Sequence, residues 1–139
     1  MRTLPNSNGF SMDFKAIERI EPDELSLRHE RCRRFLQLIC PDAGGLLVFS
    51  RLNIYYLSGT MAPGVLWLPL DGEPVLLVRR GLERARLESS MRHIMAYRSF
   101  SQLSSLCKDA GSPLGGICGA EMGGITWGVT EALEKLHNE

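Results

Sequence analysis

The segment LLVFSRLNIYYLSGTMAPGVLWLPLDGEPVLLVRR, residues 46–80, decides the fold class of this chain. It opens with LLVFS (46–50), a short continuous apolar run typical of a strand that is covered on both faces, so we expect this strand to be central in its sheet. Two further apolar runs, VLWLPL (65–70) and PVLLVRR (74–80), are separated by Asp71-Gly72-Glu73. Because Asp-Gly between apolar runs is the strongest short hairpin signal, these two strands are predicted to pair antiparallel with positive φ at Gly72.

Predicted helices and strands lie on both sides of this segment. A helix is expected to begin at Pro22 and Asp23 and to end before the breaker series at 40–45. Its apolar residues recur at helical spacing and are expected to face inward: Leu25, Cys32, Phe35, Leu36 and Ile39. After the hairpin the chain predicts a helix at 82–91, a strand at 93–97, a helix at 101–110, a strand at 116–121 and a helix from Thr126. The fold class is therefore α/β: three layers, with a mixed, mostly parallel sheet of about five or six strands, one hairpin and helices on both faces.

Length and charge limit the classes of function. The chain has 139 residues, with 16 Lys plus Arg against 16 Asp plus Glu, which fits one domain and argues against a nucleic-acid partner. No apolar run approaches the roughly 20 residues that cross a bilayer, and the start lacks a signal-peptide core, so we expect a cytoplasmic protein without a membrane partner. Residues 1–20 are expected to form an N-terminal arm and residues 21–139 the α/β domain.

Motifs of known chemistry are missing from the sequence. It contains no GxGxxG, GxxxxGK[ST] or GxSxG. The histidines His29, His93 and His137 are far apart, without HExxH spacing, and each is expected to be a partly exposed structural residue. Four cysteines lack CxxC spacing and are interpreted as reduced, mostly buried thiols. The sequence therefore predicts no catalytic residue and no metal ligand.

The most suggestive polar segment follows the first buried strand. It has a helical turn that presents Asn53 and Tyr55 and a glycine-centred loop at Ser58-Gly59-Thr60. A polar loop at the end of a buried strand is where α/β folds place ligand contacts. The alternative is turn chemistry, in which Asn53 caps the turn and the residues from Tyr55 to Leu57 belong to the core.

The order of GLLVFSRLNIYYLSG, VLWLPLDGEPVLLVRR and LERARLES, followed by a strand ending at Tyr97, resembles the N-terminal domain of the creatinase and prolidase family, which includes Xaa-Pro dipeptidases and aminopeptidases. The resemblance covers about residues 24–137, and its most specific parts are Asn53 to Gly59 and the Leu-Val-Arg79 end of the hairpin. It implies a mixed six-stranded sheet that precedes a larger pita-bread domain. Two divalent metal ions, held by two Asp, one His and two Glu, are expected in that absent domain, and no cofactor in this chain. The chain is expected to be either a cut fragment or a gene product without its catalytic half.

The resemblance also implies a role. In the family this domain helps to build the dimer and narrows the partner's active site, so that only short peptides or small guanidino compounds enter. The implied partners are a second copy in a full-length homodimer, the catalytic domain of the same or a neighbouring chain, and a short proline-containing peptide. The loop at 59–64 would do the gating and is expected to be exposed; Thr60 departs from the family pattern, which has an aromatic residue there. The candidate gating or interface residues are Asn53, Tyr55, Gly59, Thr60, Met61, Trp67 and Arg79.

Two alternatives stay open at this point. Trp67, inside VLWLPL, can instead point into the core, because buried tryptophan is common. The whole chain can instead be a stand-alone α/β binding or assembly module without peptidase activity.

Overall fold

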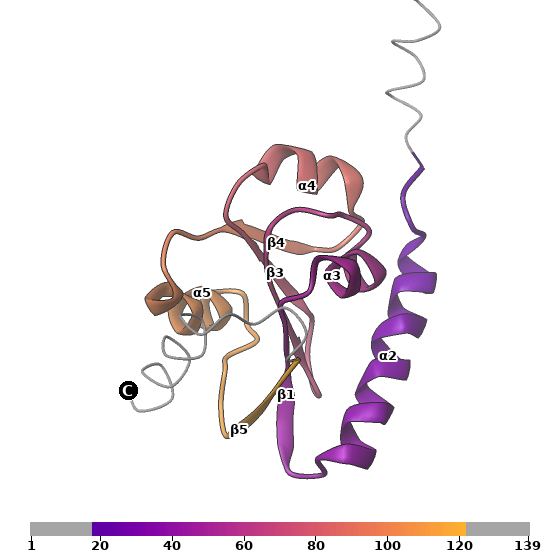
Figure 1. Cartoon of the computed structure of the whole chain (residues 1–139), viewed down its shortest axis with the longest axis vertical. Helices are drawn as coiled ribbons and strands as arrows, with labels where there is room; N and C mark the ends of the chain where they lie inside the picture. The colour runs from indigo at the N-terminus through magenta and orange to yellow at the C-terminus, as the bar shows by residue number, and fades with distance from the viewer. Residues whose placement is uncertain (1–17, 122–139) are drawn as a thin grey trace, which may run out of the picture.

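The computed structural model describes residues 18–121 (Figure 1). Most of the expected N-terminal arm and the helix expected from Thr126 lie outside the described residues. The elements in chain order are α2 (Pro22–Ile39), β1 (Ala43–Val48), α3 (Arg51–Ser58), β2 (Gly64–Pro69), β3 (Val75–Val78), α4 (Leu82–Glu88), β4 (His93–Ala96), the 3-10 helix η1 (Phe100–Gln102), α5 (Leu103–Asp109) and β5 (Ile117–Ala120).

The five strands form one sheet in the order β4-β3-β2-β1-β5. β2 is antiparallel to both β1 and β3, whereas the β3–β4 and β1–β5 pairs are parallel. Four strands therefore run in one direction and only β2 runs in the other, which confirms a mixed, mostly parallel sheet with one hairpin. β1 is paired on both sides, as its apolar run predicts, although the middle position belongs to β2.

Alternate residues of the strands build a core on each face of the sheet. One core contains Leu66, Leu76 and Ile94 and is covered by α2, α3 and α4, with Ile54 and Ala85 as helix contributions. The other core lies under α5, and its buried members are Leu47, Phe49, Val65, Trp67, Val75, Leu77, Tyr97, Leu103 and Cys107. Figure 1 shows α2 and α3 on one side of the sheet and α5 on the other. The three-layer α/β fold expected from the sequence is confirmed.

α2 has the predicted bounds but a different buried face. Pro22 occupies the first turn, where its missing N–H costs nothing, and Asp23 and Glu24 place negative charge at the helix start. Leu25, His29 and Leu36 are its buried residues.

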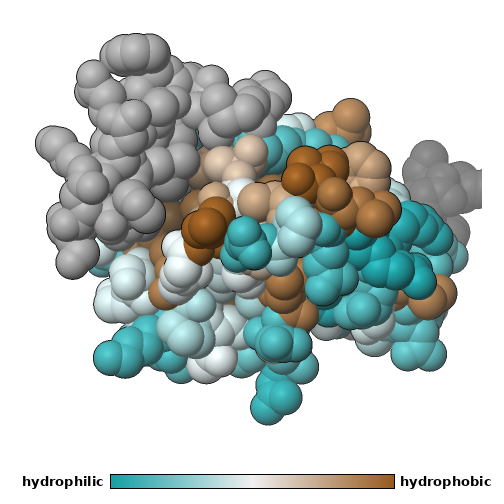
Figure 2. All heavy atoms as spheres, turned by 90° about the horizontal axis from the view of Figure 1, so that it is seen from below, coloured by the Kyte–Doolittle hydropathy of each residue, from teal (hydrophilic) through white to brown (hydrophobic). Residues whose placement is uncertain are grey.

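The prediction that Phe35 and Ile39 face inward is wrong, since they are 63% and 66% exposed. The buried residues Leu25, His29 and Leu36 are spaced four and seven apart and form one stripe, and Phe35 lies about 100° around the helix from Leu36. Leu38 is also exposed. Figure 2 views the molecule from the end at which α2 terminates and shows hydrophobic side chains gathered among hydrophilic ones. The helix therefore has an apolar surface that packing on the sheet leaves uncovered in the described structure.

The hairpin turn supplies the first testable prediction. Gly72 has φ of +115°, as the Asp-Gly turn predicts, and a Cβ there would lie 3.3 Å from Ser112 Oγ. Gly72→Val is expected to destabilise the domain by about 1 to 3 kcal/mol, because a β-branched residue rarely adopts positive φ. Urea unfolding measures the change. Gly115→Val is the matched control, since Gly115 has no positive φ and a Cβ there meets nothing within 4 Å. Equal stability of the two variants would contradict the turn assignment.

Candidate functional site

The site is built where the chain leaves β1 and enters α3. Ser50 caps the helix, because its Oγ accepts a hydrogen bond from Asn53 N at 3.4 Å. Gly59 ends the helix in the left-handed region at φ of +88° and donates its N–H to Tyr55 O at 2.7 Å. α3 is thus a helix of 8 residues with a cap at each end, and its C-terminal cap sets the direction in which the following loop leaves the helix.

The Asn53 side chain is hydrogen-bonded to the carboxylate of Glu121, a residue that the sequence analysis missed. Glu121 Oε1 accepts hydrogen bonds from Phe49 N at 3.2 Å and Ser50 N at 2.9 Å. Its other carboxylate oxygen accepts one from the Asn53 side-chain amide. The predicted strand at 116–121 could have pointed to Glu121. It is β5, which pairs with β1 in parallel, so the two strands end at the same edge of the sheet and Glu121 lies beside the start of α3. Asn53 therefore helps to fix the start of α3 rather than facing the loop.

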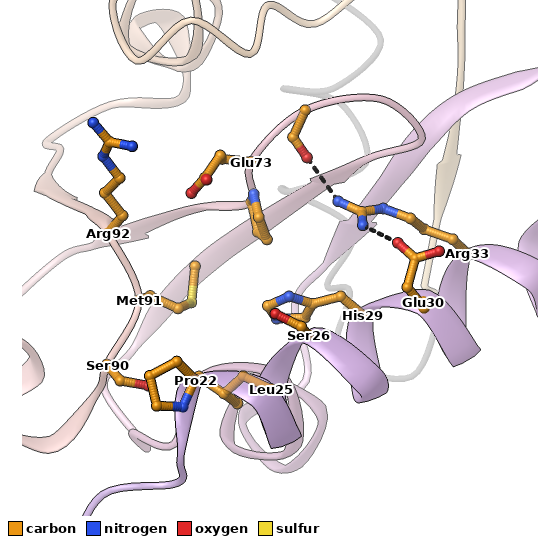
Figure 3. Close-up of a pocket in the computed structure, with 12 residues that line it drawn as sticks. Pro22, Leu25, Ser26, His29, Glu30, Arg33, Glu73, Ser90, Met91 and Arg92 are labelled. Atoms are coloured by element: carbon orange, nitrogen blue, oxygen red, sulfur yellow. Dashed lines mark hydrogen bonds and ion pairs between the residues drawn. The ribbon is translucent and has the colours of Figure 1, made fainter.

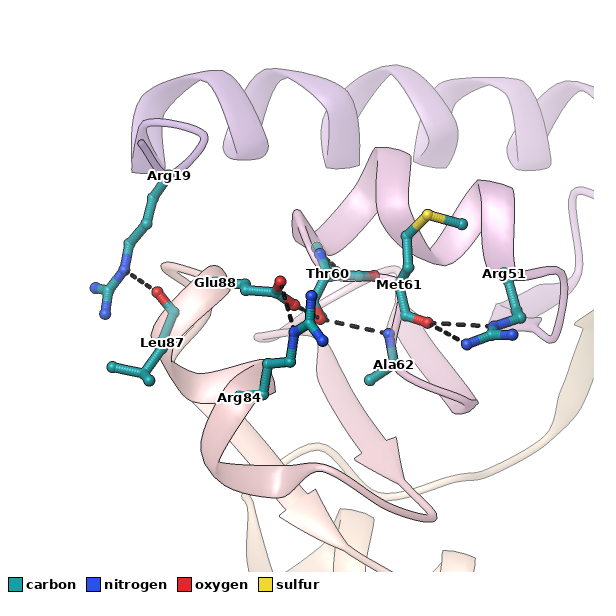
Figure 4. Close-up of polar contacts among 9 residues, drawn as sticks. Arg19, Arg51, Thr60, Met61, Ala62, Arg84, Leu87 and Glu88 are labelled. Atoms are coloured by element: carbon teal, nitrogen blue, oxygen red, sulfur yellow. Dashed lines mark hydrogen bonds and ion pairs between the residues drawn. The ribbon is translucent and has the colours of Figure 1, made fainter. Parts of the chain in front are cut away.

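The loop at 59–64 is anchored from below to α4 (Figure 4). Thr60 Oγ1 donates to Glu88 Oε1 at 2.7 Å and accepts from Ala62 N at 3.3 Å. The other Glu88 oxygen accepts from Arg84 Nε at 3.0 Å. Thr60 is 1% exposed, so the expectation that the whole loop is exposed is wrong at this residue. Its hydroxyl can be buried because it donates a hydrogen bond to the carboxylate of Glu88.

The outer side of the same loop is open. Arg51 donates from Nε and Nη2 to Met61 O, at 3.2 and 3.0 Å, which fixes the loop backbone from α3. The Met61 side chain remains 49% exposed, and Tyr55 on α3 is 44% exposed. A groove of about 560 Å³ runs between α3, the loop and α4. Its lining residues are Arg51, Tyr55, Gly59, Thr60, Met61, Ala62, Pro63, Arg80, Gly81, Arg84, Ala85 and Glu88.

The structure separates the sequence-predicted residues into two groups. Tyr55, Gly59, Thr60 and Met61 line the groove. Arg79 is not among its lining residues: its guanidinium lies 5.4 Å from the Tyr97 ring centroid and 6.0 Å from that of Phe100. Trp67 is 1% exposed in the core under α5, so the alternative that it points inward is correct. The sequence analysis did not bring together the three arginines that line the groove, Arg51, Arg80 and Arg84. Arg80 and Arg84 follow Arg51 by 29 and 33 residues, and no local pattern joins residues so far apart.

A second cavity of about 540 Å³ lies between α2 and the segments around Glu73 and Met91 (Figure 3). His29 points into this region from α2 and is 7% exposed, so the expectation of a partly exposed histidine is wrong here. Its Nε2 donates to Leu57 O at 2.7 Å, because a carbonyl can only accept. This bond joins α2 to α3 and accounts for the burial of the ring.

Burial lowers the pKa of His29 below its usual value of about 6.5, and nearby Arg33 acts in the same direction. The Leu57 carbonyl and the carboxylates of Glu30 and Glu73 oppose that shift. The neutral ring is therefore the form that the fold favours.

A pH dependence of stability follows from His29. Below about pH 6.5 the unfolded chain binds a proton that the folded chain takes up only at lower pH, so the free energy of unfolding decreases as the pH falls through this window. Urea unfolding at a series of pH values measures the decrease. His29→Gln keeps an N–H donor for Leu57 O and cannot titrate, so its decrease is expected to be smaller. An identical decrease in the variant and the parent would exclude His29 as the cause.

The remaining chemistry of the described part is limited. Among residues 18–121 no group of three or more His, Cys, Asp or Glu side chains is placed to hold a metal ion. Burial raises the pKa of the Cys107 thiol to about 12, which keeps it protonated. None of the helices in this range is long and apolar enough to span a bilayer.

Both the sequence and the fold of this chain are similar to those of known proteins. The model of the creatinase/prolidase N-terminal domain family matches residues 28–139. The fold is similar to a proline dipeptidase from Streptococcus agalactiae 2603V, with a TM-score of 0.64 and 16% identity over 80% of this chain and 87% of that chain. It is also similar to the creatinase/prolidase N-terminal domain of an X-Pro dipeptidase from Streptococcus pyogenes, with a TM-score of 0.59 and 18% identity over 79% and 87%.

A third similar structure is much longer. The Xaa-Pro dipeptidase from Bacillus anthracis has a TM-score of 0.65 and 16% identity, and the match covers 81% of this chain but 31% of that chain. At these identities the structural matches show the fold alone. No curated protein matches the chain.

Proposed function

Because the chain belongs to the creatinase/prolidase N-terminal domain family, we propose that it is the non-catalytic N-terminal domain of an Xaa-Pro-specific metallopeptidase. Its role there is to contribute to dimerisation and to narrow the entrance to the partner's active site. The substrate of that larger enzyme would be a short proline-containing peptide. The two divalent metal ions would belong to its catalytic domain, since residues 18–121 of this chain place no group of three or more His, Cys, Asp or Glu side chains where it could hold a metal ion.

The gating role is supported by one observation on the loop at 59–64: its inner side is held by hydrogen bonds, whereas its outer side presents an exposed side chain. Thr60 is buried and bonded to Glu88, and Met61 O is held by Arg51. Met61 itself is half exposed on this fixed backbone. A side chain that restricts an entrance must be held in place by its neighbours, because a loop that moves freely excludes nothing.

The dimerisation role is supported by exposed apolar side chains on the outer helices. Exposed large apolar side chains are common at protein contact sites. Those of α2 and α3 are Leu27, Phe35, Leu38, Ile39, Leu52, Tyr55 and Tyr56.

Sequencing the gene downstream of the codon for Glu139 tests the domain assignment. A reading frame that continues into a segment with two Asp, one His and two Glu at metal-ligand positions supports the proposal. A stop codon at that point would overturn it and favour a stand-alone binding or assembly module.

Hydrogen exchange tests the gating role itself. In the full-length enzyme the backbone amides of residues 60–62 and of Gly64 are expected to exchange more slowly than in the isolated chain, because the partner's entrance covers them. The amides of α5 serve as the internal reference. Equal protection of the loop in both proteins would remove the support for gating.

The isolated chain is expected to release no proline from Xaa-Pro dipeptides with added manganese or cobalt. Residues 18–121 place no group of three or more His, Cys, Asp or Glu side chains where it could hold the metal ions that activate water. The measurement is proline release at high protein concentration. Turnover that survives repurification and is lost on substitution of one residue of this chain would contradict the prediction.

A further inference from the structure

The cavity between α2 and the segments around Glu73 and Met91 has the size of a small-molecule site. Its volume is about 540 Å³, and pockets that hold small ligands in proteins measure about 300 to 1,000 Å³. Three segments line it: residues 22–33 of α2, residues 72–74 between β2 and β3, and residues 90–92 before β4. It is separate from the groove at the loop 59–64, since the two share no lining residue.

His29 presents a hydrogen-bond acceptor to this cavity. The residue is 7% exposed, and its ring points into the cavity from α2 (Figure 3). Nε2 donates to Leu57 O at 2.7 Å, and burial lowers the pKa of the ring, so Nδ1 keeps its lone pair. No donor in the part of the chain that the structure describes is bonded to Nδ1. Because a buried acceptor without a partner is unfavourable, this nitrogen favours a ligand that carries an N–H donor.

One negative and one positive charge of the cavity are unpaired. The carboxylate of Glu73 and the guanidinium of Arg92 form no ion pair with each other or with any other residue between 18 and 121. The other two charged groups are already paired, since Arg33 donates to Glu30 and to two backbone carbonyl groups. Figure 3 shows Glu73 and Arg92 at one end of the cavity. Such a pair of opposite charges is complementary to a ligand that carries both an ammonium and a carboxylate.

The opposite end of the cavity is apolar. Figure 3 shows Pro22 and Leu25 of α2 at this end, with His29 and Met91 on opposite sides between the two ends. The flexible thioether of a methionine adapts to apolar groups of different shape. A ligand that matches both ends therefore has its two charges close together on a compact apolar body.

We propose that this cavity binds a free α-amino acid with an apolar side chain, in its zwitterionic form. The ammonium group donates to the Glu73 carboxylate and to Nδ1 of His29, and the carboxylate accepts from Arg92. The side chain lies toward Leu25 and Met91. A residue inside a peptide has neither charge on its backbone, so the cavity selects free amino acids over peptides. The inference does not rest on the proposed function, because it uses none of the residues of the loop at 59–64.

The test is an NMR titration of the complete 139-residue chain at constant ionic strength. The probes are L-leucine, N-acetyl-L-leucine, which lacks the ammonium, L-leucinamide, which lacks the carboxylate, and glycine, which lacks the side chain. L-Leucine is expected to shift the backbone amides of residues 25–33, 72–73 and 90–92. Each of the other three is expected to bind about tenfold more weakly, since a hydrogen bond to a charged group or the burial of an apolar side chain contributes about this much.

Two variants assign each charge of the ligand to its partner. Glu73→Gln is expected to weaken the binding of L-leucine and L-leucinamide about tenfold and to leave N-acetyl-L-leucine unchanged, because only the first two carry the ammonium. Arg92→Gln is expected to weaken L-leucine and N-acetyl-L-leucine about tenfold and to leave L-leucinamide unchanged. The matched controls are Glu83→Gln and Arg98→Gln, which lie outside the cavity and are expected to change nothing. All four side chains are exposed, so the variants are expected to fold like the parent.

The ring of His29 supplies a readout of its own. A lone pair that accepts a hydrogen bond changes the nitrogen NMR resonance of its atom. L-Leucine and L-leucinamide are therefore expected to move the Nδ1 resonance, and N-acetyl-L-leucine is expected to leave it in place.

Four results would overturn the proposal: no binding of L-leucine, equal binding of L-leucine and its two derivatives, equal losses in the cavity and control variants, or an Nδ1 resonance that L-leucine leaves unmoved. None of these results bears on the reading frame after Glu139 or on loop protection in the larger enzyme, so failure of this inference is distinguishable from failure of the proposed function.

Discussion

Gly64→Ala is expected to destabilise the domain by about 3 kcal/mol or more, because the added methyl group would collide with the backbone of the neighbouring strand. A Cβ on Gly64 would lie 2.0 Å from Leu77 O and 3.0 Å from Val78 Cα. Gly64 is paired with Val78 in the β2–β3 ladder, so neither strand can move aside without losing the register. Since small domains have about 5 to 15 kcal/mol of stability in total, the variant would be largely unfolded or marginally stable.

Chemical denaturation followed by circular dichroism measures the effect of Gly64→Ala. The control is Gly115→Ala, because a Cβ on Gly115 meets nothing within 4 Å and its φ is not in the left-handed region. That control is expected to change the free energy of unfolding by less than about 0.5 kcal/mol. A Gly64→Ala protein as stable as the control would show that β2 and β3 do not approach each other as described.

Leu47→Ala is expected to lower the free energy of unfolding by about 2 to 5 kcal/mol, through lost apolar contacts and the cavity left behind. Leu47 is 4% exposed and belongs to the core under α5. β2 and β5 flank it, with Trp67 and Ala120 as its pairing partners. Close neighbours on both sides restrict the collapse that would otherwise fill the cavity.

A leucine-to-alanine substitution on the surface shows how much of the effect on stability is due to the burial of Leu47. Leu38→Ala removes the same atoms from a residue that is 82% exposed, and is expected to change stability by less than about 0.5 kcal/mol. Urea unfolding of both variants gives the comparison. A loss below about 1 kcal/mol for Leu47→Ala would place β1 at an edge of the sheet.

Local patterns in the sequence were sufficient for the elements. The Asp71-Gly72 turn and the apolar run of β1 act over a few residues, and the structure has both of them. The alternative that Asn53 caps the turn is wrong, because Ser50 is the N-cap of α3 and Asn53 donates its backbone N–H to it. The spacing of apolar residues on α2 was less informative, because Phe35 and Leu36 are adjacent and only one can lie on the buried stripe. Helical periodicity predicts that a face is buried, but the neighbouring elements decide which one.

The candidate site depended on contacts between distant parts of the chain. Met61 and Thr60 could be placed in one loop from the sequence, but the burial of Thr60 depends on Glu88, which lies 28 residues away. The arginines of the groove and the carboxylate of Glu121 at the start of α3 likewise come from separate elements. Single-sequence patterns contain no information about such pairs, because their contact energy arises only when the elements pack.

The sequence by itself determined the α/β class, the hairpin, the buried first strand and the resemblance to the creatinase and prolidase N-terminal domain, all of which follow from residues that are neighbours along the chain. The tertiary structure alone decided that Trp67 is core, that Arg79 lies beside Tyr97 and Phe100, and that Arg51, Arg80 and Arg84 line one groove. The physical reason is that burial and charge clustering depend on which faces pack together, and the packing of β1, α3 and α4 brings side chains into contact that the sequence keeps apart.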